Sequence, residues 1–70
     1  MLAERLRRLR QERKLKQVEV AEAVGLSLHG YQDLEREVIP RGGVLLNLAE
    51  FYDVSIDWLM GRTEKREVNR

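Results

Sequence analysis

Residues 17–36 read QVEVAEAVGLSLHGYQDLER, and this stretch predicts two short helices joined by one tight turn. Ala21 stands four residues before Gly25 and supplies the small side chain that two steeply crossing helices need where their backbones approach. Gly25 can take the left-handed backbone conformation that reverses the chain at little cost. The apolar residues that seal the angle between the two helices are Val20, Val24, Leu26, Tyr31 and Leu34.

A helix pair with this spacing is typical of a helix-turn-helix, whose second helix enters the major groove of DNA. Apolar periodicity and capping residues predict five helices, at residues 2–13, 17–24, 28–36, 43–52 and 56–60, and no strand. Pro40 and the Gly42–Gly43 pair interrupt the chain before the fourth helix. We therefore expect an all-α, five-helix domain over residues 1–61, followed by a charged, flexible and unpacked tail over residues 62–70.

The composition limits what the protein can be. The chain has no cysteine and a single histidine, so disulfides and thiolate metal sites are excluded and His29 cannot hold a metal ion unaided. No apolar run reaches the roughly 20 residues that span a bilayer. Met1 leads directly into a charged helical segment and not into a signal peptide. We expect a soluble cytoplasmic domain with no membrane partner, metal or other cofactor.

Charge is distributed unevenly along the chain, although the net charge is only +1. Residues 1–16 carry seven basic and two acidic side chains, whereas residues 17–60 carry two basic and eight acidic ones. Residues 61–70 carry four basic and two acidic side chains. A phosphate backbone would therefore be attracted to one part of the molecule and repelled by another.

The chain resembles the phage repressor/Cro type of helix-turn-helix domain, which has the λ-repressor-like fold. The resemblance covers residues 2–62 and rests on the segments LRRLRQERKLKQ, VAEAVGLS, LEREVIP and LLNLAEFYDVSIDWLMGR. It implies that the protein binds operator DNA as a symmetric dimer and regulates transcription, which would associate it with the nucleoid.

The resemblance also implies which residues read bases, namely Leu28, His29, Gln32 and Asp33 on the third helix. Gln32 can pair with adenine, His29 can donate to guanine, Asp33 can accept from cytosine and Leu28 can touch a thymine methyl. The helix is atypical because it has no Arg or Lys before Arg36, so the common arginine–guanine contact is absent. The alternative for each of these side chains is a solvated surface position.

Phosphate contacts are implied in the same way. Gln17 at the start of the second helix and the loop arginines Arg36 and Arg41 match phosphate-binding positions of the family, and Ser27 joins this set. Lys16, next to Gln17, is the best placed of the N-terminal basic residues. The remaining members of a generic basic face, which is usually only solvated, could add non-specific phosphate attraction: Arg5, Arg7, Arg8, Arg13 and Lys14.

Two further features follow from the resemblance. Arg10 and Glu35 match an arginine–glutamate pair of the family, and we expect a largely buried, bidentate ion pair; the alternative is a weak surface pair. Val54, Ile56 and Trp58 match the dimer interface, and we expect Trp58 with Val54 or Ile56 to be partly exposed contacts across a two-fold axis.

Two functions from different classes fit these observations. The first is a sequence-specific regulator that binds a pseudo-palindromic operator in double-stranded DNA as a homodimer, without cofactor or small-molecule substrate. The second is a protein-interaction module on the same fold, antirepressor or antitoxin-like, whose acidic residues 17–60 leave little or no DNA binding. An enzyme is not expected, because His29 has no catalytic partner near it in the sequence and so small a core cannot enclose a substrate.

Overall fold

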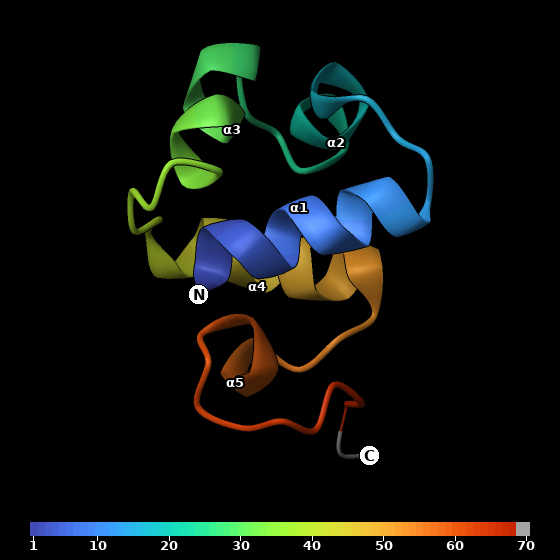
Figure 1. Cartoon of the computed structure of the whole chain (residues 1–70). Coiled ribbons are helices and arrows are strands. Elements are labelled where there is room, and N and C mark those ends of the chain that lie inside the picture. The colour runs from blue at the N-terminus through green and yellow to red at the C-terminus, as the bar shows by residue number, and fades with distance from the viewer. Residues whose placement is uncertain (69–70) are drawn as a thin grey trace.

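The computed structural model describes residues 1–68, which form five helices and no strand (Figure 1). The helices are α1 (Leu2–Glu12), α2 (Gln17–Ala23), α3 (Leu28–Leu34), α4 (Gly42–Tyr52) and α5 (Ile56–Leu59). The predicted all-α class is confirmed, and every helix begins and ends within two residues of its predicted bounds. Residues 69–70 of the predicted tail lie outside the described residues.

Two serines start the helices that follow tight turns. The Ser27 hydroxyl accepts a hydrogen bond from the Gly30 amide at 3.0 Å, and the Ser55 hydroxyl accepts one from the Trp58 amide at 3.1 Å. Each serine satisfies a backbone donor that the first turn of a helix leaves without a partner. The positions of α3 and α5 along the chain are therefore set by local side-chain chemistry.

Helix α1 lies across the middle of the molecule, with α2 and α3 on one side and α5 on the other (Figure 1). Its apolar stripe enters the core at Leu2, Leu6 and Leu9, all buried. The other helices complete the core with large side chains that are fully buried: Val20, Tyr31, Leu48, Tyr52 and Leu59. Since α1 contacts both halves, it holds the helix-turn-helix against α4 and α5.

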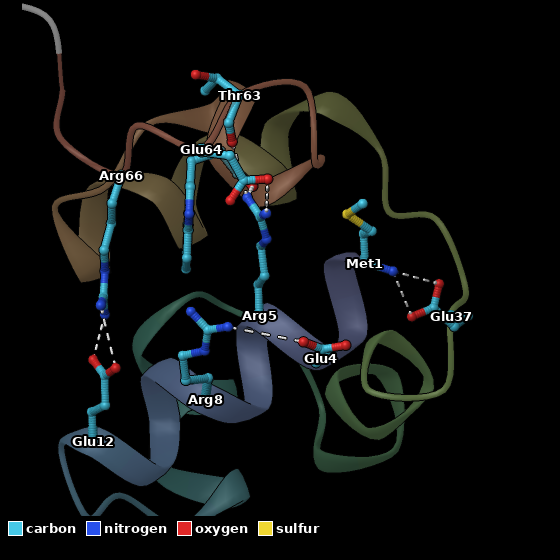
Figure 2. Close-up of polar contacts among 10 residues, drawn as sticks. Met1, Glu4, Arg5, Arg8, Glu12, Glu37, Thr63, Glu64 and Arg66 are labelled. Atoms are coloured by element: carbon cyan, nitrogen blue, oxygen red, sulfur yellow. Dashed lines mark hydrogen bonds and ion pairs between the residues drawn. The ribbon is translucent and has the colours of Figure 1, made fainter.

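The expectation that the tail is unpacked is wrong for residues 62–66. The Arg66 carbonyl accepts a hydrogen bond from the Ser55 amide at 2.9 Å, and the Thr63 carbonyl accepts one from the Arg5 guanidinium at 3.2 Å. The Arg66 side chain forms an ion pair with Glu12 at the end of α1 (Figure 2). Through these contacts the tail packs against the start of α5 and against α1.

The expected exposure of Trp58 and Val54 is also wrong, because they are only 3% and 5% exposed. The Arg5 guanidinium lies 4.6 Å from the centre of the Trp58 ring, and the Arg66 guanidinium lies 5.1 Å from it. Arg5 also donates a hydrogen bond to the Trp58 carbonyl. A ring stacked by cations from α1 and from the tail gains cation–π energy and loses its access to water.

Truncation after Gly61 should expose Trp58, the single tryptophan of the chain. We expect stronger quenching of its fluorescence by acrylamide and a loss of about 1–2 kcal/mol in the free energy of unfolding. A control truncated after Val68 should retain the quenching of the full chain. Unchanged quenching in the shorter variant would show that the tail does not cover the ring.

Candidate nucleic-acid interface

Helices α2 and α3 are joined by a turn at Gly25 and pack against each other. The backbone of Gly25 has φ +78°, and the Leu26 amide donates to the Ala21 carbonyl at 2.8 Å, which closes the end of α2. Ala21 and Tyr31 are buried between the helices. The turn therefore holds α3 as a separate short helix with one face in the core and the opposite face open.

The four proposed base-reading residues lie on α3 with different degrees of exposure. Leu28 and His29 are exposed, whereas Gln32 and Asp33 are half-buried. The Asp33 carboxylate lies 3.8 Å from His29 Nε2 and 3.5 Å from an Arg36 guanidinium nitrogen. The Arg36 guanidinium can offset part of the negative charge of Asp33.

A buried ion pair joins α1 to the end of α3. Arg10 Nε donates to Glu35 Oε2 at 2.8 Å, and Arg10 Nη2 donates to Glu35 Oε1 at 3.1 Å. The two side chains are 17% and 5% exposed. This is the bidentate geometry expected for a planar guanidinium and a carboxylate, and Arg10 Nη1 also donates to the Leu15 carbonyl at 3.2 Å.

The hydrogen-bond chain continues from this pair to the helix-turn-helix. Gln17 Nε2 donates to Glu35 Oε1 at 3.2 Å, and Gln32 Nε2 donates to Gln17 Oε1 at 3.1 Å. The orientation of the Gln32 amide therefore follows from the orientation of Gln17, which follows from Glu35. We call this chain, Arg10–Glu35–Gln17–Gln32, the polar relay.

The polar relay also sets the charge state of Glu35. Burial alone would raise the pKa of this carboxyl, but hydrogen bonds from Arg10 and Gln17 favour the ionised form and hold the pKa below its usual value. The same pairing raises the pKa of Arg10. Both groups are thus fully charged near neutral pH. Glu35 therefore accepts hydrogen bonds from Arg10 and Gln17 and donates none.

The structure brings together some of the proposed phosphate-binding residues and separates others. Gln17 and Arg36 line one polar depression of about 440 Å³, together with Arg7, Arg10, Gln32 and Glu35. Lys16 and Arg41 are exposed at the starts of α2 and α4 and are not among the residues that line it. The oxygen of Ser27 is used as the cap of α3.

Sequence reasoning placed Arg7 only in the generic basic face. Arg7 Nη1 donates to the Glu35 carbonyl at 3.2 Å, which brings Arg7 beside the polar relay. The signal was present in the spacing, since Arg7 stands three residues before Arg10 and residues three apart share a helix face.

A second depression, of about 510 Å³, lies between α4, α5 and the tail, and we call it the α4–α5 groove. Its lining includes Leu46, Ile56 and Val68, which are large apolar side chains exposed to solvent. Of the three residues expected in a dimer interface, only Ile56 is exposed. Sequence reasoning missed Leu46 and Val68, because their proximity depends on the packing of the tail.

Comparison with known proteins identifies the class of the domain. The family described as helix-turn-helix matches residues 6–59. The chain therefore belongs to the helix-turn-helix family, and the fold expected from the sequence resemblance is confirmed.

One relative is similar over almost the whole chain. It is YobD of Bacillus subtilis (strain 168), described as an uncharacterized HTH-type transcriptional regulator, which is 38% identical over 65 residues. The match covers 91% of this chain and 58% of YobD, so the chain spans little more than half the length of that relative. No solved structure matches the chain. Within residues 1–68, no helix has the length and apolar character needed to cross a membrane.

A double-mutant cycle should detect the energy of the Arg10–Glu35 pair. We expect Arg10→Met or Glu35→Gln alone to lower the free energy of unfolding by about 3–5 kcal/mol, because each leaves a buried charge without its partner. The double variant should lose much less than the two single losses together. The exposed Arg66–Glu12 pair is the matched control, and its coupling should be clearly smaller. Coupling near zero for Arg10–Glu35 would contradict the structural role of the pair.

Proposed function

We propose that this protein is a sequence-specific regulator of transcription that binds double-stranded DNA with α3 in the major groove. The observation that carries the proposal is the polar relay, which orients Gln32 on the open face of α3. In support, the chain belongs to the helix-turn-helix family and is similar to a protein described as an HTH-type transcriptional regulator. Such a protein acts in the cytoplasm at the nucleoid, by binding and not by catalysis.

Gln32 has the clearest role in base recognition. One of its two amide hydrogens is used by Gln17, which leaves the second hydrogen and the carbonyl oxygen for a base. An amide in this state can donate to N7 and accept from N6 of adenine. Because the relay holds the amide in place before binding, little side-chain entropy is lost when the base contact forms.

The neighbouring residues of α3 complete the reading surface. His29 donates to a guanine acceptor, Asp33 accepts from a cytosine amine, and Leu28 contacts a thymine methyl. Because α3 lacks a lysine or arginine, affinity depends on phosphate contacts from other elements. We assign these contacts to Gln17 and Arg36, with Lys16, Ser27 and Arg41 at the edges of the interface.

We propose that the protein binds a pseudo-palindromic operator as a homodimer, with two copies of α3 about 34 Å apart in successive major grooves. The α4–α5 groove is the surface proposed for the second copy. Exposed Leu46, Ile56 and Val68 gather there, and an apolar patch on a small domain favours association. Ile56 stays in the proposed interface. Val54 and Trp58 are buried, and we assign them to the core that lies beneath this interface.

The second candidate function is protein interaction on the same fold with weak or no DNA binding. It is favoured by the charge of residues 17–60, which carry eight acidic and two basic side chains. In that case the acidic segment would repel phosphates more strongly than α1 attracts them. The two functions differ in one measurable property, because only the first requires DNA affinity that falls steeply with added salt.

Selection from a random pool of DNA duplexes should enrich a palindrome, and the selected duplex should bind with salt-dependent affinity. Gln32→Ala should lose about 1–3 kcal/mol of discrimination at one adenine in each half-site. Gln11→Ala, which removes an exposed glutamine of α1, is the control and should select the same palindrome as the native chain. No enrichment, together with no binding at low salt, would favour the protein-interaction function.

Ile56→Glu should weaken self-association about tenfold or more, because it places a charge in an apolar contact. Ile39→Glu changes an equally apolar and more exposed residue outside the groove and should leave association unchanged. Analytical ultracentrifugation over a concentration series measures both variants. A native chain that stays monomeric at all concentrations, or equal effects of the two variants, would contradict this interface.

A further inference from the structure

Arg7 is an exposed arginine whose guanidinium is held by a hydrogen bond to α3 and not by a carboxylate of residues 1–68. Its guanidinium is anchored on the Glu35 carbonyl at the C-terminal end of α3 by one hydrogen bond of 3.2 Å. A guanidinium has five N–H donors, so this bond leaves several of them available. Among residues 1–68, Arg7 forms no ion pair with a carboxylate, whereas Glu35 is occupied by Arg10.

The depression that Arg7 lines has the chemistry of an anion site. Its lining residues are all polar or charged: Arg7, Arg10, Gln17, Gln32, Glu35 and Arg36. Arg10 is paired with Glu35 and Arg36 lies 3.5 Å from the Asp33 carboxylate, so the charge of Arg7 is the excess positive charge of this lining. No apolar side chain is present there to favour an uncharged ligand or an apolar protein segment.

We propose that Arg7 binds a phosphate of the DNA backbone in this depression, together with Arg36 and the amide of Gln17. This inference rests on the proposed DNA-binding function and extends it to α1. A planar guanidinium can donate two parallel hydrogen bonds to one phosphate. Because Arg7 is already held by the Glu35 carbonyl, fewer rotamers are lost when the phosphate binds.

The location of Arg7 gives the contact a second consequence. Gln32, the proposed adenine reader, lines the same depression. A phosphate bound by Arg7 would therefore fix how far α3 enters the groove beside the base that Gln32 reads. Contacts of this kind set the register of a protein on DNA without carrying sequence information themselves.

The test compares Arg7→Ala with Arg8→Ala in binding to the selected duplex over a series of salt concentrations. Arg8 is the neighbouring α1 arginine, but it lies 3.9 Å from Glu4 and 5.9 Å from the Trp58 ring and does not line the depression. Loss of one phosphate contact should reduce the slope of log K against log salt by about 0.9. We expect this reduction for Arg7→Ala, together with equal weakening of its binding to all DNA sequences. Arg8→Ala and Arg7→Lys should keep the native slope.

A scan with single methylphosphonate groups, which are uncharged phosphate replacements, identifies the phosphate itself. At one position the replacement should weaken binding by the native chain clearly more than binding by Arg7→Ala, because Arg7→Ala has already lost one of the ligands of that phosphate. If Arg7→Ala keeps the native slope, or responds to every methylphosphonate as the native chain does, the inference is overturned while DNA binding stands. If the native chain binds no duplex, the proposed function fails instead.

Discussion

The bidentate ion pair between Arg10 and Glu35 is the constraint on which the rest of the structure depends. Two charges that are largely removed from water are stable only while each keeps its partner and its remaining hydrogen bonds. Here the partners come from α1 and from the end of α3, and Gln17 at the start of α2 completes the set. The pair and its hydrogen bonds therefore connect three helices, and in this arrangement neither of the two charges is left unpaired. The same arrangement orients Gln32, the proposed base reader, through Gln17.

The distribution of charge explains why recognition would involve more than one helix. Helix α3 carries Asp33 and no arginine or lysine, so its own attraction for DNA is weak. Basic side chains near α3 lie on α1 and in the loop after α3, and the polar depression brings Arg7 and Arg36 next to Gln17. Base reading and phosphate attraction are thus assigned to different elements, joined by the Glu35 side chain and backbone. On the other side of α1, Arg5 and the tail cover Trp58 and leave Ile56 as the exposed apolar residue of α5.

Local chemistry made most of the fold predictable from the sequence. Gly25, Ser27, Pro40 and Ser55 mark helix ends by their own backbone preferences or hydrogen bonds, and these signals located the five helices together with apolar periodicity. The Gly42–Gly43 pair was expected to interrupt the chain before the fourth helix, but it forms the first turn of α4. What the sequence could not supply was contact between distant residues. The covered Trp58 depends on Arg66 reaching Glu12, which is 54 positions away in the chain. Long arginines beside an aromatic residue look solvated in a sequence, and only the packed chain shows that they bury its ring.

A double-mutant cycle on DNA affinity shows whether the polar relay positions Gln32 for DNA. Gln17→Leu keeps the approximate shape of the side chain but removes its hydrogen bonds to Glu35 and Gln32. The affinities of the native chain, Gln17→Leu, Gln32→Ala and the double variant are measured on the selected duplex and on one with the adenine replaced. We expect Gln17→Leu to lose discrimination at the same base pair as Gln32→Ala, and the double variant to lose little further discrimination. Independent, additive losses at different base pairs would contradict this role of the polar relay.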